Sequence, residues 1–396
     1  MNFVSVIGQG YVGLPLSLAI AKSGFKVFGV ERDSSKVNLL NSGKCDLENL
    51  DKSLLEVLLR NKKLNFTSNF ECIAQSKIIL ICVPTPLDKM SNPDLTLLVE
   101  ATTSVGKFLA KDSLVIIEST VATGTTRDIL IPILERESGL NRGDFFVSYS
   151  PERIDPLNMT WSLKNTPKVI AGFSDESCEL AVNFYNNFID KTVKCQSLEV
   201  AETSKLLENA FRLINISFIN EMSMFCNKFG IEITEVIQAA SSKPYGFLPF
   251  YPSIGVGGHC IPVDPLYLSD KAKQVGSPLT MIDKARQINN EMPTYFIRRA
   301  FEKIGGLAGK KILILGLSYK PNISDTRESP VEPFIKGLRD KGAAVEWHDD
   351  LVGDWNGEKS VALGSNYDLA ILATPHDYFD LSKLGNVPIL DTHRSL

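Results

Sequence analysis

Residues 255 to 265, with the sequence GVGGHCIPVDP, combine a cysteine with three glycines and an aspartate. Cys260 could attack a carbonyl carbon as a thiolate, and Asp264 could orient a water or a lysine. Gly257, with the glycines beside it, carries no side chain and would let a substrate approach the thiol. The alternatives are a buried thiol, a turn aspartate held before Pro265, and a structural role for the adjacent His259.

A second set of polar residues lies in SLEVAETSKLLENAFRLINISFINEMSMFCNKF, residues 197 to 229, which contains neither proline nor glycine. This segment predicts a long helix, apolar on much of its circumference and therefore buried, which we expect to pack against a partner subunit. Lys205 and Asn209 are four residues apart and share one face of that helix, with Glu202 one turn earlier. The ordinary explanation of these polar residues is an exposed stripe that forms ion pairs. Because the helix is otherwise so apolar, the alternative is that they line a cavity.

Two further polar segments follow strand candidates. SPERIDP, residues 150 to 156, carries Glu152 and Arg153 in a loop stiffened by prolines, and EST, residues 118 to 120, ends the preceding strand candidate with Thr120. Doubly wound folds bind ligands at the carboxyl ends of their strands, so both segments are expected at one edge of a sheet. Turn chemistry alone is the alternative for each of them.

The pattern GQGYVG near the start of the chain predicts a dinucleotide-binding turn. Gly8, Gly10 and Gly13 follow the strand candidate FVSVI and open a helix, which suits a tight turn, a bound pyrophosphate and close packing of helix on strand. Glu31 ends the next strand candidate, where its carboxylate would bind a ribose 2′-hydroxyl and favour NAD over NADP. Arg32 beside it would favour a 2′-phosphate instead. A glycine turn without a ligand is disfavoured by the order strand, turn, helix, strand and acid.

Alternating strand and helix patterns are expected to position these residues. Strands are predicted at FVSVI (3–7), KVFGV (26–30), KIILICV (77–83), SLVIIES (113–119) and DFFVSYS (144–150), and again from residue 310 at KILILGL, AVEWHDD, YDLAILATP and VPILDTH. Apolar strands separated by helices, such as SPVEPFIKGLRDKG, indicate parallel sheets covered on both faces. The predicted fold is α/β, with two Rossmann-like doubly wound domains (1–196 and 301–396) joined by a central helical domain (197–300) that contains the long helix.

The composition excludes several classes of protein. The chain has 396 residues, of which 44% are hydrophobic and 22% charged, and a net charge of −4, so it offers no electrostatic attraction to nucleic acid or to an anionic membrane. No apolar run reaches the roughly 18 residues of a membrane-spanning helix. Seven cysteines without a C-x-x-C pair, and only four histidines, argue against a disulfide framework and a metal site. We therefore expect no metal and a reducing cytoplasm.

The motifs together resemble those of the nucleotide-sugar 6-dehydrogenases, the family of UDP-glucose and GDP-mannose dehydrogenases. The resemblance covers nearly the whole chain through IGQGYVGLP, CVPTP (82–86), EST, SPERIDP, AETSKLLENA (201–210), GVGGHCIPVDP and YKPNISDTRESP (319–330). Enzymes of this family oxidise a sugar C6 alcohol to a carboxylate with two NAD per turnover and no metal. The resemblance implies an N-terminal NAD domain, a helical centre that forms a homodimer through the long helix, and a C-terminal domain that binds the nucleotide diphosphate.

The resemblance also implies roles for individual residues. The catalytic residues would be Cys260 as nucleophile, Lys205 and Asn209 as the pair that stabilises oxygen charge, Glu152 and Thr120 around the hydrolytic water, and Asp264 beside the cysteine. The cofactor-binding residues would be Gly8, Gly10, Tyr11, Val12, Gly13, Glu31, Arg32, Pro84, Thr85, Thr120 and Arg327. The substrate-binding residues would be Glu152, Arg153, Lys205, Asn209, Tyr251, Gly257 and Lys320.

The cysteine motif narrows the expected substrate. GGHCIPVDP resembles the branch of the family that acts on UDP-N-acetylhexosamines, whereas the UDP-glucose enzymes usually read GGSCFPKD. The expected function is therefore the NAD-dependent four-electron oxidation of the C6 alcohol of a UDP-N-acetylhexosamine to the uronate, through a thiohemiacetal and a thioester on Cys260. The alternatives are a UDP-glucose 6-dehydrogenase, a single-step hydroxyacid-type dehydrogenase that has no use for the cysteine, and a nucleotide-sugar sensor without catalysis.

Three departures from the family pattern bear on the site. VATG at 121–124 lacks the proline that is common after EST, which predicts a looser loop. His393 stands where the family usually shows arginine, which leaves Arg394 as its candidate replacement. PSIG at 252–255 replaces the common PGPG before the cysteine motif and predicts a change in the sugar loop.

Overall fold

The computed structural model describes residues 3–45, 47, 50–154, 158 and 160–393. The chain divides into two compact units, Met1–Leu207 and Glu208–Leu396. The boundary falls within one long helix, α7 (Leu198–Phe229), so the residues of AETSKLLENA are shared between the two units.

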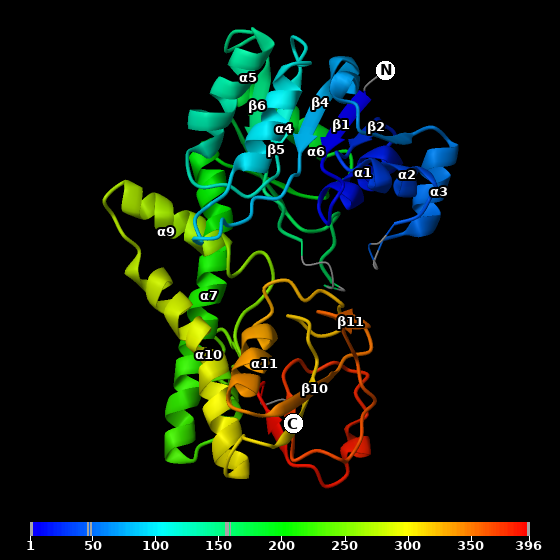
Figure 1. The fold of residues 1–396 in the computed structure, drawn as a ribbon. Helices are drawn as coiled ribbons and strands as arrows, with labels where there is room; N and C mark the ends of the chain where they lie inside the picture. Colours follow the sequence, from blue (N-terminus) through cyan, green and yellow to red (C-terminus); the bar gives the residue numbers. More distant parts are fainter. Residues whose placement is uncertain (1–2, 46, 48–49, 155–157, 159, 394–396) are drawn as a thin grey trace. The chain divides into compact units, whose positions relative to one another are not determined.

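The first unit is built on an eight-stranded sheet with the order β3-β2-β1-β4-β5-β6-β7-β8 (Figure 1). Its strands are β1 (Phe3–Ile7), β2 (Lys26–Val30), β3 (Leu64–Thr67), β4 (Ser76–Ile81), β5 (Leu114–Ile117), β6 (Phe146–Tyr149), β7 (Lys168–Gly172) and β8 (Thr192–Lys194). All neighbouring strands run parallel except β6 and β7, which are antiparallel. The order reverses between β1 and β4, and doubly wound folds bind their ligands at such a reversal.

Helices cover both faces of this sheet. They are α1 (Gly13–Lys22), α2 (Ser34–Asn41), α3 (Lys52–Arg60), α4 (Thr96–Gly106), α5 (Ile131–Ser138) and α6 (Asp175–Tyr185), with a 3₁₀ helix at Phe70–Gln75 and a π-helical turn at Thr126–Leu130. Helices α1, α2, α3 and α6 pack on one face, and α4 and α5 on the other. In β4, Leu80 contributes to the first core and Ile79 and Ile81 to the second, because successive strand side chains point to opposite faces.

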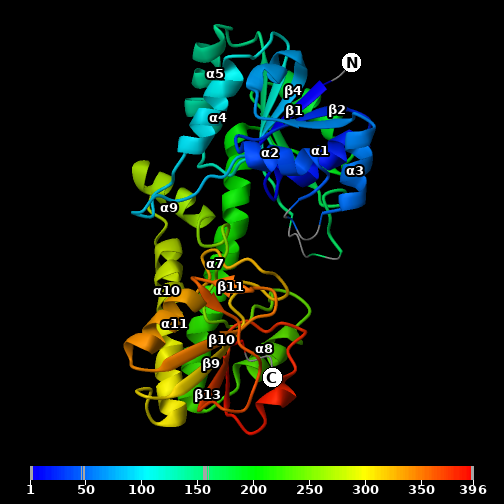
Figure 2. The same cartoon turned by 45° about the vertical axis from the view of Figure 1, so that its right-hand side comes forward.

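The second unit contains a parallel four-stranded sheet with the order β10-β9-β13-β14 (Figure 2). Its strands are β9 (Lys311–Leu315), β10 (Ala344–His348), β13 (Leu369–Leu372) and β14 (Ile389–Asp391), and a separate hairpin consists of β11 (Asp354–Trp355) and β12 (Glu358–Lys359). Helices α10 (Thr280–Ile304) and α11 (Val331–Asp340) cover one face. The other face is covered by loops and a short 3₁₀ helix at Leu381–Leu384.

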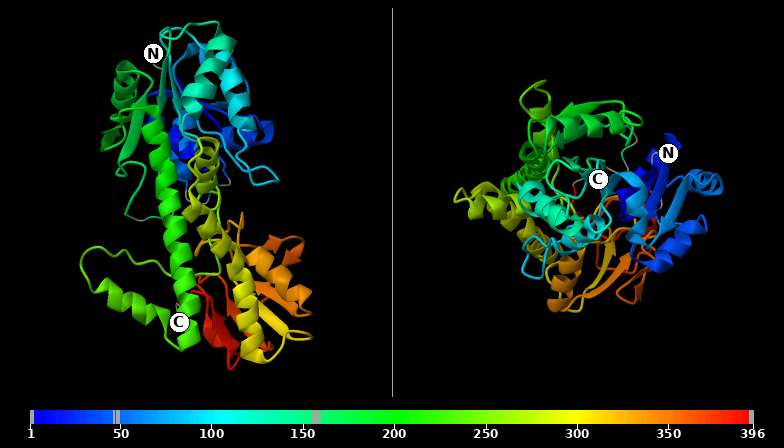
Figure 3. Two further views of the ribbon diagram at one scale, coloured as in Figure 1. Left: turned by 90° about the vertical axis from the view of Figure 1, so that its left-hand side faces the viewer. Right: turned by 90° about the horizontal axis from the view of Figure 1, so that it is seen from above.

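The C-terminal part of α7 packs along α10 (Figure 3). Leu213 of α7 shares a small core with Ile282 and Ala285 of α10, and Ser217 Oγ donates a hydrogen bond of 2.8 Å to Ala285 O. Helix α7 ends before Gly230, whose φ of +67° is the left-handed conformation that commonly terminates helices. Helices α8 (Ile233–Ser241) and α9 (Asp264–Gln274) complete the unit.

The predicted α/β fold with a long central helix is confirmed. The nine predicted strands lie within a few residues of their predicted positions, and α7 begins one residue inside the predicted segment. Strands β3, β7 and β8 and the β11–β12 hairpin were not predicted from the sequence. Of these, β7 matters most for the site, because its first residue, Lys168, contacts Glu152.

Candidate active site

The glycine turn lies between β1 and α1. Gly8 has a φ of +86°, and a Cβ there would lie 2.9 Å from Cys82 O; a Cβ on Gly13 would lie 1.8 Å from Gly8 O. Packing within the chain therefore explains both glycines. Gly10 differs, because nothing lies within 4 Å of a Cβ placed on it. Its bare backbone leaves room for a ligand at the N-terminus of α1, where free N–H groups suit a pyrophosphate. Two other predicted cofactor residues lie in the same turn, the exposed Tyr11 and the half-buried Val12.

Glu31 lies beside this turn at the end of β2. Its Oε2 accepts a hydrogen bond from Gln9 N at 3.2 Å and lies 4.0 Å from Lys36 Nζ. Arg32 turns its guanidinium toward Glu100, with the two charged groups 4.0 Å apart. The acidic side chain is thus held on the turn, while the basic one faces another carboxylate. This arrangement favours a ribose hydroxyl over a 2′-phosphate.

The CVPTP and EST segments are bound to each other at the carboxyl ends of β4 and β5. Thr85 Oγ1 donates to Thr120 O at 2.7 Å, and Ser119 Oγ donates to Val83 O at 2.7 Å. Pro84 is exposed between them. Because β4 is the neighbour of β1, these residues continue the edge that the glycine turn begins.

Glu118, Lys168 and Tyr185 form a buried polar cluster in the first unit. Lys168 Nζ lies 2.5 Å from Glu118 Oε2, and the Tyr185 hydroxyl donates to the other oxygen of the same carboxylate. Lys168 Nζ also lies 3.7 Å from Glu152 Oε2. Burial opposes the charge of Lys168, but Glu118 and Glu152 outweigh it and raise the pKa of the ammonium. Neither Lys168 nor Tyr185 was predicted from the sequence as a site residue.

Glu152 and Arg153 of SPERIDP both bind backbone groups of the chain. Glu152 Oε1 accepts hydrogen bonds from Arg153 N and Ile154 N, both at 2.6 Å. Arg153 Nη1 donates to Pro167 O at 2.9 Å, so this predicted substrate residue is hydrogen-bonded within the chain. Asp155 lies outside the described residues.

Glu202 of α7 fixes the loop that follows Thr120. It is fully buried, and its two carboxylate oxygens accept hydrogen bonds from Gly124 N at 2.6 Å and Thr126 N at 2.9 Å. The hydroxyls of Thr123 and Thr203 share another hydrogen bond of 2.8 Å. The loop at VATG, for which the missing proline predicted looser packing, is thus held to α7 by three hydrogen bonds. Burial raises the pKa of Glu202 to about 7, against hydrogen bonds that lower it.

We expect Glu202 to make the protein less stable as the pH rises from 5 to 8. Its carboxyl titrates at 4.5 when unfolded and at about 7 when folded, so stability that is present below pH 4.5 is lost by the time the pH has passed 7. The full difference corresponds to about 3 kcal/mol of unfolding free energy. Glu202→Gln has no carboxyl to titrate, so its Tm should fall less between pH 5 and pH 8 in calorimetry. An equal fall in the two proteins would contradict this assignment.

Asn209 and Asp264 are joined beside Cys260 in the second unit. Asn209 Nδ2 donates to Asp264 Oδ2 at 2.6 Å, and both residues are buried. The backbone N–H of Asp264 donates to Cys260 O at 2.8 Å, so one aspartate closes the cysteine turn and holds the amide. Lys205 is half-buried one helical turn before Asn209 and on the same face of α7. The structure thus brings Asn209 of the predicted helix to the motif that carries Cys260 and Asp264.

Gly257 and Gly258 make room for a loop of the same unit. A Cβ on Gly257 would lie 2.7 Å from both Glu328 O and Tyr319 Cβ, and one on Gly258 would lie 2.8 Å from the Tyr319 ring. Gly258 N also donates to Arg327 O at 3.2 Å. The interpretation of Gly257 as open space for a substrate is corrected here, because Tyr319 and the backbone at residue 328 occupy that space.

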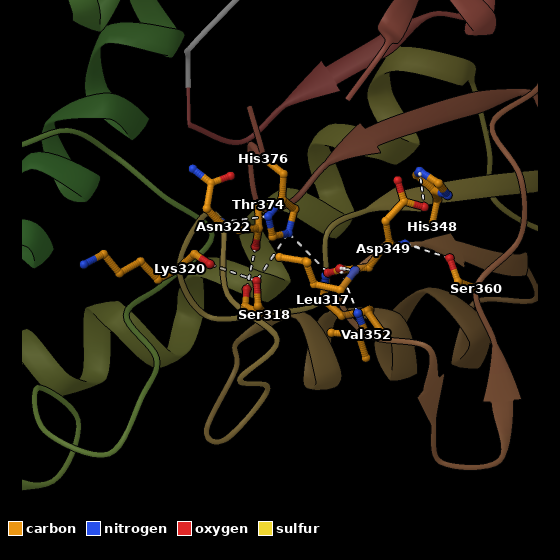
Figure 4. Close-up of polar contacts among 12 residues, drawn as sticks. Leu317, Ser318, Lys320, Asn322, His348, Asp349, Val352, Ser360, Thr374 and His376 are labelled. Carbon is orange, nitrogen blue, oxygen red and sulfur yellow. Dashed lines mark hydrogen bonds and ion pairs between the residues drawn. The ribbon is translucent and has the colours of Figure 1, made fainter. Parts of the chain in front are cut away.

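The loop at 319–328 carries Lys320 and Arg327. The Arg327 guanidinium binds Asp325, with Nη2 2.5 Å from Oδ2. Burial opposes the negative charge of Asp325, but the Arg327 hydrogen bonds prevail and lower the pKa of that carboxyl. The carbonyl of Lys320 accepts a hydrogen bond from Ser318 Oγ, while its side chain extends away from the neighbouring cluster (Figure 4).

A buried polar cluster anchors this loop at the carboxyl edge of the second sheet (Figure 4). His376 Nδ1 accepts a hydrogen bond from Asn322 N at 2.8 Å, so its proton is on Nε2, which lies 3.2 Å from Asp349 Oδ2 and 3.3 Å from Ser318 Oγ. Burial works against ionisation of Asp349, but His376 and Leu317 N lower its pKa to about 2. These residues were not predicted from the sequence as site residues, although Asp349 directly follows the apolar strand β10.

Two further predicted positions in the second unit are His393, near its end, and Tyr251, before α9. Burial lowers the pKa of His393 to about 4, so the imidazole is neutral at neutral pH and cannot supply the charge of an arginine. Arg394 lies outside the described residues. Tyr251 is 55% exposed in the segment between α8 and α9.

Three absences apply to the part of the chain that the structure describes. No set of three or more histidine, cysteine, aspartate or glutamate side chains is arranged to hold a metal ion. None of the seven cysteines, all of which are described, forms a disulfide. Its helices include none with the length and apolar character to span a membrane.

Comparison with known proteins gives consistent matches along the chain. The NAD-binding, central and UDP-binding domains of the UDP-glucose/GDP-mannose dehydrogenase family match residues 2–189, 199–291 and 313–395. A UDP-N-acetyl-D-glucosamine 6-dehydrogenase of Pseudomonas aeruginosa is 36% identical, over 96% of this chain and 94% of its own. A UDP-N-acetyl-D-mannosamine dehydrogenase of Pyrococcus horikoshii is 35% identical, over 95% and 90%. The solved structure of a UDP-D-ManNAc dehydrogenase from Pyrococcus horikoshii matches with a TM-score of 0.91 at 32% identity, covering 99% of this chain and 95% of that one.

Proposed function

Because the chain belongs to the UDP-glucose/GDP-mannose dehydrogenase family of NAD-dependent enzymes, we propose that it oxidises the C6 alcohol of a UDP-N-acetylhexosamine to the uronate. The observation that carries the proposal is the hydrogen bond between Asn209 and Asp264 beside Cys260. A single hydride transfer needs no thiol. A cysteine whose turn is closed by Asp264, which in turn binds the Asn209 amide, therefore supports a second oxidation at the same carbon. The names of the relatives support an N-acetylated sugar, and GGHCIPVDP supports the same branch.

NAD, when bound, accepts one hydride in each oxidation. The residues that would hold it fit such a group: the turn from Gly8 to Gly13 is open at Gly10, and Glu31 is fixed on the turn where a ribose hydroxyl would donate to it. The Thr85–Thr120 hydrogen bond keeps the adjoining edge of the sheet rigid. On the second unit, Arg327 is the further candidate for a cofactor contact.

We expect Gly10→Ala to weaken NAD binding about tenfold or more without unfolding the protein. The added methyl meets nothing in the chain, and its stability should change by no more than about 0.5 kcal/mol. The same methyl on Gly13 would clash with Gly8 O and should lower the Tm. Isothermal titration with NAD and thermal unfolding of both variants test this. Unchanged affinity in Gly10→Ala would show that the turn does not approach the cofactor.

Chemistry at the sulfur begins once the first hydride and the hydroxyl proton have left C6. The Cys260 thiolate forms a bond to the aldehyde carbon, and the carbonyl electron pair moves to the oxygen. An amide nitrogen carries two hydrogens, and Asp264 accepts only one of those on Asn209, so the other can donate to the oxyanion. The Lys205 ammonium would add a full positive charge. The second hydride then leaves the same carbon and gives a thioester.

Hydrolysis of the thioester is assigned to Glu152 and Thr120. A water adds to the thioester carbon, one of its protons passes to the Glu152 carboxylate, and the C–S bond breaks with its electron pair on sulfur. One alcohol, two NAD and one water thus give one carboxylate, two NADH and three protons. Lys320, Arg153 and Tyr251 are proposed to contact the UDP-sugar.

Counting NADH per sugar distinguishes the proposal from its alternatives. Two NADH per sugar are expected, whereas a single-step dehydrogenase would release one and a sensor none. A panel of UDP-GlcNAc, UDP-ManNAc, UDP-GalNAc and UDP-glucose then identifies the sugar from kcat/KM. A preference for UDP-glucose would refute the proposed branch and leave the two-step mechanism intact.

We propose that the enzyme is a homodimer that buries one stripe of α7. Exposed apolar side chains recur along this helix with spacings of four and seven residues, which is the pattern of a helix seam. They are Leu207, Phe211, Phe218, Phe225 and Phe229. Phe218→Asp would place a charge in that seam, and sedimentation velocity should then show a monomer at concentrations where the unaltered protein sediments as a dimer. Lys228→Asp, at a polar position on the same helix, is the control, and an unaltered protein that sediments as a monomer would refute the proposal.

The enzyme is proposed to act in a reducing cytoplasm. A thiolate nucleophile must remain reduced to attack an aldehyde, and none of the seven described cysteines forms a disulfide that would indicate an oxidising compartment.

A further inference from the structure

The antiparallel pairing of β6 with β7 brings Lys168 to Glu152. Ser148 pairs with Gly172 and Tyr149 with Ala171. The same register, continued past the end of β6, sets position 168 opposite position 152. The side chains meet there, with Lys168 Nζ 3.7 Å from Glu152 Oε2.

Besides Glu152, Lys168 contacts Glu118 and the backbone of Pro151. Glu118 Oε2 lies 2.5 Å from Lys168 Nζ, Pro151 O accepts a further hydrogen bond from that ammonium at 3.2 Å, and Tyr185 donates to Glu118. The side chains of Glu118 and Lys168 are 0% and 4% exposed, whereas Glu152 is 16% exposed. One positive charge thus lies between two carboxylates, and only the second of them is open to water.

We propose that Lys168 is a positioning residue for Glu152 in the hydrolysis of the thioester. The inference rests on the proposed function, which assigns the hydrolytic base to Glu152. Two backbone N–H groups bind Oε1 of Glu152 at 2.6 Å, so its Oε2 is the oxygen that faces Lys168 and remains for a water proton. The ammonium stabilises the carboxylate charge, but at 3.7 Å it does not take up the lone pair that must accept the proton. The close partner of Lys168 is Glu118, which keeps the ammonium in place when Glu152 becomes protonated.

The proposed role predicts that a change at Lys168 slows hydrolysis of the thioester and leaves the two oxidations unaffected. In Lys168→Met, both hydride transfers to NAD should proceed, since neither of them is assigned to Glu152. Proton transfer from water to Glu152 should slow, so the C–S bond should persist. The expected result is a burst of two NADH per active site within about threefold of the normal rate, followed by turnover reduced about 10²-fold. The KM for the UDP-sugar should be unchanged.

The decisive measurement is the intact mass of enzyme quenched in acid during turnover with UDP-GlcNAc and NAD. Lys168→Met should show most of the protein carrying the sugar nucleotide on Cys260, and Lys168→Arg, which keeps the charge, should restore at least tenfold of the lost turnover. Lys111→Met removes an exposed lysine of the same unit, paired with Asp144, and should show no adduct. The double variant Glu118→Gln/Lys168→Met leaves neither of these two charges buried, and it should fold and accumulate the same adduct even if Lys168→Met does not fold.

Glu152→Gln distinguishes a failure of the role of Lys168 from a failure of the role proposed for Glu152. If Glu152→Gln accumulates the adduct while the folded Lys168 variants hydrolyse it at the normal rate, the role of Lys168 is overturned and the proposed function stands. If Glu152→Gln also hydrolyses normally, the assignment of Glu152 fails and the role of Lys168 fails with it. If the Lys168 variants lose the first NADH burst as well, the residue serves the whole fold and not hydrolysis.

Discussion

Cys260→Ser is expected to lower the rate of uronate formation by roughly 10⁴-fold or more, which is the usual effect of removing a covalent nucleophile. A serine hydroxyl is far less acidic than a thiol, so almost no alkoxide is present to trap the aldehyde. The first hydride transfer does not need the sulfur and should still occur. The variant should therefore release at most about one NADH per sugar and stall, either with free aldehyde or with a slowly hydrolysed ester.

The measurement is the ratio of NADH to uronate in a single incubation, together with the mass of the quenched protein. Cys195→Ser is the control, because that half-buried thiol lies after β8 and has no role in the mechanism. Unaltered protein should carry an adduct on Cys260 during turnover. Normal turnover by Cys260→Ser, or free aldehyde from the unaltered protein without any adduct, would refute covalent catalysis.

Asn209→Ala is expected to lower kcat by about 10²–10³-fold, since it removes a hydrogen-bond donor to the oxyanion of the thiohemiacetal. The change also deprives the buried Asp264 carboxylate of a hydrogen bond of 2.6 Å, which should cost about 1–3 kcal/mol of stability. Both effects are expected because the proposed mechanism has one amide group bind Asp264 and the substrate. The KM should change much less than kcat, because the donor acts on charge that develops during the reaction.

Steady-state kinetics and thermal unfolding separate these two effects. Asn215→Ala on the same helix is the matched control, because Asn215 only donates to Phe211 O within α7. That variant should keep the normal kcat. A kcat for Asn209→Ala within a few-fold of normal would mean that the amide supports Asp264 and does not contact the oxyanion.

The sequence predicted those elements of the fold whose apolar pattern is uninterrupted. Strands such as KILIL and LVII are buried on both faces and cannot be mistaken for surface segments. Strand β7 was missed because it begins with Lys168, and a lysine ordinarily indicates the surface. Its burial depends on Glu118, which is far away along the chain, and no local pattern reports such a pairing.

In the candidate site, too, the sequence predicted single residues but not the contacts between distant segments. The motifs identified Cys260, Asn209 and Asp264 singly, but their contact depends on how α7 packs near α9, which spacing along the chain does not fix. Glu202 was expected on a cavity-lining face, yet its carboxylate binds the backbone at Gly124. The residue types and the helical period predict which side chains lie on the same face of a helix. Tertiary packing decides which residues that face contacts.

The fit of Tyr319 against Gly257 and Gly258 constrains how this enzyme can change. A side chain at Gly257 would also meet the backbone oxygen of Glu328, and one at Gly258 would be strained at a φ of +83°. A smaller residue at position 319 would therefore not by itself allow either glycine to change. A cysteine motif transplanted from a relative would therefore fit against Tyr319 only where it keeps both glycines, as GGSCFPKD does.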